Sequence, residues 1–121
     1  MTSDEKKAFL LLKSVIFHYH GLDEDEQQLL TRAAQNLDAE EELAWANEFI
    51  AKDYYDAFDR ARGYLRNIML SLEKEKRLKH LTDVWKANLE KGYISEMEAM
   101  GMIKLAKDWG VEKELVASIR Q

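Results

Sequence analysis

Apolar residues recur at intervals of three and four along most of the chain, which is the spacing of one face of an α-helix. The first pattern follows a helix cap at Thr2 or Ser3 and consists of Ala8, Leu11, Leu12, Val15 and Tyr19. Further apolar residues fill most of the remaining circumference of this segment, so we expect a central helix that other helices surround. Gly21 is expected to end it, because glycine tolerates the positive φ common after helix C-termini.

Capping residues precede the next patterns. Asp23 with Glu26, and Ser95 with Glu98, have the spacing of a capping box, in which each side chain bonds a backbone amide of the first turn. Asp38 is expected to cap a third helix, because a run of glutamates and then an apolar stripe follow it.

Four further helices are predicted from the remaining apolar positions. Asp53 is expected to open the first of them, with Gly63 inside it and Gly92 and Gly110 ending later ones. The inward-facing sets, in chain order, are Tyr54, Phe58, Ala61, Leu65, Ile68 and Leu72; Leu78, Leu81, Trp85 and Leu89; Met97, Met100, Ile103, Leu105, Ala106 and Trp109; and Val111, Leu115, Val116 and Ile119.

The chain contains no proline, and helix-forming residues outnumber β-branched ones. No linker or low-complexity tract interrupts the pattern. We therefore predict one all-α domain over residues 1–121, a compact bundle of six to seven helices.

Composition narrows the functional classes. With 46% hydrophobic and 34% charged residues the chain has the balance of a folded protein, and it has no cysteine, which suits a reducing compartment. The longest apolar run is far shorter than the ~20 residues of a membrane span. No Gly-rich phosphate loop or nucleophile elbow occurs. We expect a cytoplasmic protein that is not an enzyme.

Charge is distributed unevenly. Residues 1–59 contain 14 acidic and 5 basic residues, whereas residues 60–80 contain 2 acidic and 7 basic ones. The acidic first half argues against nucleic acid as a partner and favours a protein partner. The basic segment 60–80 is expected to pair with the acidic helices, either within the chain or between subunits.

Two stretches near the start and in the last third share one pattern, which predicts an internal pseudo-repeat. Residues 16–30 and 87–110 each contain a helix end, a glycine, a polar linker, a glutamate and an apolar helix. A shift of 72 residues places Glu26 on Glu98 and Ala34 on Ala106. In an acidic helical chain of this length, the pattern resembles the tellurite-resistance TerB-like family over most of the chain.

The resemblance implies a metal-binding helical scaffold in which acidic loop residues hold a cation. The ligands that the resemblance implies are Glu26 and Glu98. The residues of the first stretch themselves add His20, Asp23 and Asp25 as candidate ligands. The aspartate that the family carries before the glycine is replaced by His20 in the first stretch and by Lys91 in the second. Judged from the residues alone, the cluster around His18 and His20 is either a small cation site or an ordinary helix end.

Two functions follow as expectations. The first is a small acidic binding or scaffold domain of the TerB-like type, in a bacterial stress-related system, with a divalent-cation site; no other cofactor is expected. The alternative is an acidic helical protein that binds a basic protein partner without metal.

Overall fold

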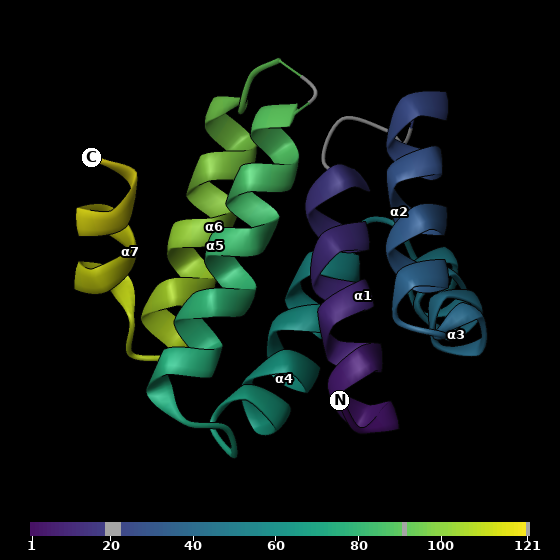
Figure 1. The fold of residues 1–121 in the computed structure, drawn as a ribbon, viewed down its shortest axis with the longest axis horizontal. Coiled ribbons are helices and arrows are strands. Elements are labelled where there is room, and N and C mark those ends of the chain that lie inside the picture. The colour runs from purple at the N-terminus through teal and green to yellow at the C-terminus, as the bar shows by residue number, and fades with distance from the viewer. Residues whose placement is uncertain (19–22, 91, 121) are drawn as a thin grey trace.

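The computed structural model describes residues 1–18, 23–90 and 92–120. Within this part of the chain every regular element is an α-helix, which confirms the predicted all-α bundle (Figure 1). No helix of these residues combines the length and the hydrophobicity needed to cross a membrane. The helices are α1 (Ser3–Phe17), α2 (Glu24–Asn36), α3 (Glu40–Ala51), α4 (Ala57–Met69), α5 (Lys74–Glu90), α6 (Glu96–Asp108) and α7 (Glu112–Ile119).

Helix α1 is the centre of the bundle. It lies between α2 and α3 on one side and α5 and α6 on the other, and α4 also packs against it (Figure 1). Five consecutive residues, Ala8 to Leu12, are at most 8% exposed, so the helix is buried around its whole circumference. Each fully buried leucine or isoleucine contributes roughly 1.5–3 kcal/mol to stability. The expectation of a central, surrounded helix is confirmed; Tyr19 and Gly21 lie outside the described residues.

Three of the predicted caps are confirmed. The Thr2 hydroxyl accepts a hydrogen bond from the Glu5 amide at the start of α1. Asp23–Glu26 and Ser95–Glu98 both form complete capping boxes at the starts of α2 and α6. These interactions span three residues, which is why the sequence could predict them.

Two predicted helix starts are wrong. Helix α3 begins after Ala39 without a side-chain cap, and Asp38 instead adopts a positive φ of 52° in the turn that ends α2. Helix α4 begins at Ala57 rather than near Asp53, whose carboxylate accepts a hydrogen bond from the Tyr55 amide and so favours a turn. Tyr54, predicted to face inward, is 65% exposed.

Part of the predicted inner face of α5 and α6 is also wrong. Leu89, Met97 and Met100 are each more than half exposed, whereas Met102 and Glu98 are fully buried. The buried stripe of α6 thus lies on the opposite side of the helix from Met97 and Met100. Both faces of α6 carry apolar residues, so hydrophobic spacing alone did not distinguish them.

The segments α2–α3 and α6–α7 have matching local structure. Both bounds of α6 lie 72 residues after those of α2. In the turn after α2 the Ala39 amide bonds the Ala34 carbonyl, and in the turn after α6 the Val111 amide bonds the Ala106 carbonyl. Asp38 and Gly110 hold the positive-φ position of these Schellman-type turns. Membership of a TerB-like repeat stays a prediction.

The two turns give a matched pair of substitutions. Gly110→Ala should destabilise the protein by about 1 kcal/mol, because a Cβ there meets no atom within 4 Å and the cost is that of the left-handed backbone alone. Asp38→Gly should stabilise it by about 0.5 kcal/mol for the same reason. Urea unfolding measures both; a stabilised Gly110→Ala variant would contradict the assigned turn.

Candidate functional site

The acidic residues predicted as metal ligands lie at the starts of two different helices. Glu26 is 3% and Glu98 is 0% exposed. One carboxylate oxygen of each already accepts a backbone amide, at 3.3 Å from Asp23 N to Glu26 Oε1 and 3.0 Å from Ser95 N to Glu98 Oε1. Both glutamates therefore have a structural role, since they satisfy an amide that the helix leaves without a partner.

The structure does not gather the predicted ligands into a visible cation site. Asp23 uses its Oδ1 to accept the Glu26 amide at 2.8 Å, and Asp25 is exposed in the first turn of α2. His20 lies outside the described residues, as does Lys91. Among residues 1–18, 23–90 and 92–120, no group of three or more histidine or carboxylate side chains is placed to hold a metal.

The basic segment 60–80 pairs with acidic side chains of the same chain. Arg62 makes two hydrogen bonds to Asp108, at 2.8 and 3.0 Å, and so joins α4 to α6. Lys74 contacts Glu114 on α7, and Arg77 donates to the Trp109 carbonyl at the end of α6. These bases pair within the chain, as expected, but the acidic partners of Arg62 and Lys74 lie on α6 and α7 and not in the acidic first half of the chain.

Arg60, at the start of the same segment, closes the end of α3. Its guanidinium donates to the Phe49 and Asp53 carbonyls at 2.8 Å each and also pairs with Asp56. The guanidinium also lies over the Phe49 ring, 4.9 Å from its centroid. Arg60 thereby supplies the donors that the last carbonyls of α3 need, and it orders the turn that carries Tyr54 and Tyr55.

A concave surface lies between α2 and the α3–α4 turn, and we call it the α2–α3 groove. Its cavity has a volume of about 730 Å³. A smaller cavity of about 180 Å³ shares His18 and Tyr54 with it. The groove is lined by His18 after α1, by Gln27, Leu30 and Thr31 of α2, by Leu43, Asn47 and Ala51 of α3, and by Tyr54.

The groove combines an apolar base with neutral polar groups. Leu30 and Leu43 supply apolar surface, while Gln27 and Asn47 offer both donors and acceptors. Burial lowers the pKa of His18, so its ring is neutral at neutral pH. The His18 and Tyr54 rings are in contact, with centroids 5.9 Å apart. Such a lining fits an apolar ligand segment that carries neutral hydrogen-bonding groups.

Sequence reasoning missed most of the groove. Gln27, Thr31 and Asn47 are exposed polar residues on helices, and nothing local marks them as lining residues. Tyr54 was assigned to the core. The one available signal was the Asp-Tyr-Tyr-Asp sequence at 53–56, whose aspartates favour a turn and thus an exposed tyrosine pair.

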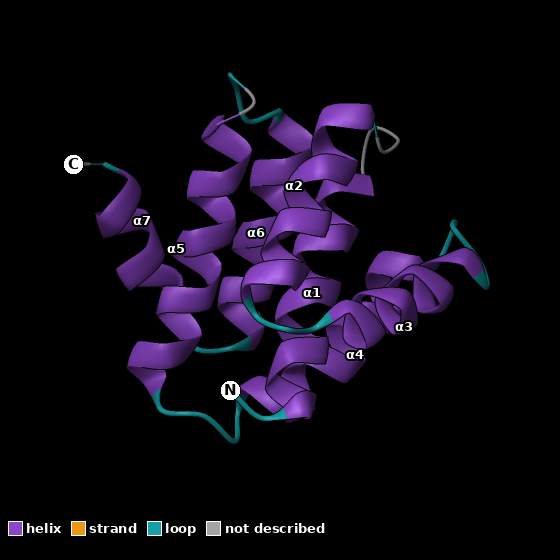
Figure 2. Cartoon of the chain, turned by 45° about the vertical axis from the view of Figure 1, so that its right-hand side comes forward, coloured by secondary structure: helices purple, strands orange, loops and turns teal. Residues whose placement is uncertain are grey.

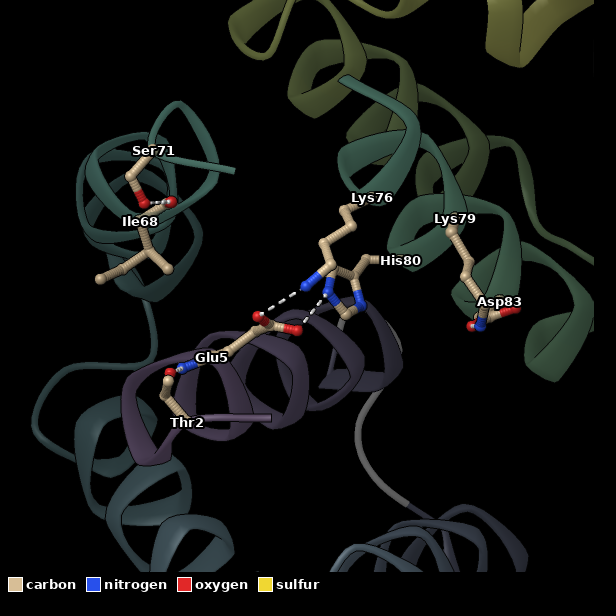
Figure 3. A network of polar contacts seen from close by, with 8 residues as sticks. All are labelled: Thr2, Glu5, Ile68, Ser71, Lys76, Lys79, His80 and Asp83. Atoms are coloured by element: carbon tan, nitrogen blue, oxygen red, sulfur yellow. Dashed lines mark hydrogen bonds and ion pairs between the residues drawn. The ribbon is translucent and has the colours of Figure 1, made fainter. Parts of the chain in front are cut away.

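A second polar arrangement, buried between α1 and α5, was also missed. Figure 3 shows Glu5 pointing from α1 toward Lys76 and His80 of α5. His80 Nε2 lies 3.4 Å from Glu5 Oε2, which is long for a hydrogen bond, and the Phe9 ring covers the imidazole at a centroid distance of 5.4 Å. His80 is 5% and Glu5 is 7% exposed.

Burial determines the protonation state of His80. Desolvation lowers the pKa of His80, and the nearby Glu5 and Asp83 only partly oppose this effect. Lys79 adds to the lowering. The ring is therefore neutral at neutral pH. Because a substrate would have little access to either side chain, the pair is better suited to joining α1 and α5 than to acid–base catalysis.

Comparison with known proteins identifies no relative of this chain. No family model, no curated protein and no solved structure matches it. The TerB-like resemblance is thus neither supported nor contradicted by the comparisons.

The buried histidine makes stability dependent on pH. Because folding lowers the pKa of His80 below its ordinary value of 6.5, the unfolded chain takes up the proton first as pH falls. Stability should be full above that value and decline below it. In urea unfolding between about pH 5 and about pH 8, His80→Gln should show a shallower decline than the native protein. If stability falls with pH equally steeply in both proteins, the assigned burial of His80 is wrong. His18→Gln is the control, because burial also lowers the pKa of His18.

Proposed function

We propose that this protein is a small acidic binding domain that docks a basic amphipathic protein segment in the α2–α3 groove. The observation that carries the proposal is an open groove of about 730 Å³ whose lining is neutral and whose two flanking helices are strongly acidic. Apolar side chains of the partner would enter the groove, and its lysine or arginine side chains would meet the surrounding carboxylates.

The carboxylates next to the groove are available for a partner. Residues 23–51 contain nine acidic residues and one basic residue, Arg32. Six acids that lie on α2 and α3 make no ion pair within the described part of the chain: Glu24, Asp25, Glu40, Glu41, Glu42 and Glu48.

Helical spacing places two of these acids on the groove side. Glu24 precedes Gln27 by three residues and Thr31 by seven, and Glu40 has the same spacing to Leu43 and Asn47. Residues at these intervals share one face of a helix. The acids are thus at the rim, where they would steer a basic partner and contribute to its orientation.

The TerB-like resemblance supports a second proposal, a stress-related scaffold with a divalent-cation site at Glu26 and Glu98. What favours it in the structure is the burial of both carboxylates at corresponding positions of α2 and α6. The basic-partner proposal requires no such ion, and the two proposals are tested separately.

The basic-partner proposal is tested with a fluorescein-labelled amphipathic peptide of leucine and lysine. Fluorescence anisotropy should show binding that weakens with added salt. Glu24→Lys with Glu40→Lys should weaken it about threefold to tenfold, the effect of two rim charges. Thr31→Arg, which places a long cation in the groove, should weaken it further.

A charge-matched control distinguishes the groove from general acidity. Glu73→Lys with Glu75→Lys changes the net charge equally at exposed positions before and within the first turn of α5. This variant should bind the peptide almost as well as the native protein. If both double variants lose affinity equally, the peptide binds the acidic surface without using the groove, and the proposal fails.

The cation proposal is tested by a thermal melt of metal-stripped protein with Ca²⁺, Mg²⁺, Mn²⁺ or Zn²⁺. It predicts that an ion raises the Tm of the native protein but not that of the Glu26→Gln, Glu98→Gln variant, because an ion bound only to the folded state stabilises it. Glutamine keeps the acceptor of each capping box, so the variant isolates charge. No shift with any ion would leave the glutamates as helix caps alone.

A further inference from the structure

Helix α6 carries an exposed apolar stripe that none of the other described helices covers. Met97 is 51% and Met100 is 52% exposed, and Tyr93, just before the helix, is 63% exposed. Glu96, Lys104 and Lys107 are exposed on the same helix. At 100° per residue, an arc of about 100° opposite the buried stripe contains all five exposed residues of α6: Glu96, Met97, Met100, Lys104 and Lys107.

The corresponding positions of α2 show that the fold does not require these methionines. A shift of 72 residues places Met97 on Asp25 and Met100 on Gln28, both of which are exposed and polar. The two helices have matching bounds and capping boxes, yet only α6 has apolar residues on its outer side. The methionines therefore point to a contact outside the chain.

We propose that the outer stripe of α6 packs against the same stripe of a second copy of this chain, with the two helices antiparallel. The charges of the stripe are self-complementary. Glu96 lies in the first turn of α6, and Lys104 lies two turns later. With a two-fold axis at Met100, each Glu96 faces Lys104 of the second copy, and the methionines meet at the centre.

The opposite, parallel arrangement is disfavoured, since it would place Glu96 on Glu96 and Lys104 on Lys104. Met100 and Met97 suit the proposed contact because unbranched thioether side chains adapt to each other in a small interface. A helix of this length spans about 20 Å, so the contact is small and the dimer weak and concentration-dependent. This surface is separate from the α2–α3 groove.

Sedimentation velocity from about 10 µM to about 1 mM tests the proposal. The native protein should shift from monomer to dimer over this range. Met97→Asp with Met100→Gln, which installs the residues that α2 carries, should weaken association by about tenfold or more. Its urea unfolding midpoint should stay at the native value, because both side chains are exposed in the monomer.

Charge exchange tests the antiparallel pairing itself. Glu96→Lys or Lys104→Glu alone should weaken association, and the double variant Glu96→Lys, Lys104→Glu should restore it. A native protein that stays monomeric at the highest concentration overturns the proposal, as does a methionine variant that associates like the native protein. A double exchange that fails to restore association overturns the antiparallel geometry.

Discussion

The structure depends on the burial of α1 around its whole circumference. A helix without a solvent-facing side needs neighbours on every side, and α2 and α3, α4, and α5 and α6 provide them. The same burial governs the chemistry of α1. Glu5 is only 7% exposed and lies against Lys76 and His80. Burial also lowers the pKa of Lys13 despite nearby Glu90 and Asp83. Polar groups on such a helix are costly unless a partner satisfies them.

Charged residues have one of two roles in this protein, depending on whether an oppositely charged side chain lies nearby. The bases of segment 60–80 tie α4, α5, α6 and α7 together, and Arg62–Asp108 is the best-formed example because it has two hydrogen bonds. Six acids of α2 and α3 make no ion pair within the described residues: Glu24, Asp25, Glu40, Glu41, Glu42 and Glu48. Figure 2 shows α5 and α7 on one side of α1 and α3 on the other. The bases of α5 that pair with α6 and α7 are therefore separated from the acids of α3 by the central helix.

The α2–α3 groove and the α6 stripe lie on two helices that share one local design. Both helices begin with a capping box and end in a Schellman-type turn, and three corresponding positions are buried in both: Glu26 and Glu98, Leu30 and Met102, and Ala34 and Ala106. Their exposed sides are free to differ, because exposed side chains contribute little to folding. α2 places Gln27 and Thr31 at a groove, whereas α6 presents Met97 and Met100 to solvent. The two proposed binding surfaces therefore lie on the outer sides of two helices with matching ends.

The sequence by itself determined the helices, the three confirmed caps and the buried character of α1. Each depends on interactions within one or two turns, as in the Asp23–Glu26 box. It misplaced the start of α4, where Asp53 favours a turn, and it misplaced the faces of Met97 and Met100. Both sides of α6 carry apolar residues, and only packing decides which side is buried. Only the tertiary structure brought Glu5 to His80 and formed the groove between Thr31 and Asn47. These residues lie on different helices, and the angles at which helices pack around α1 decide which of them meet.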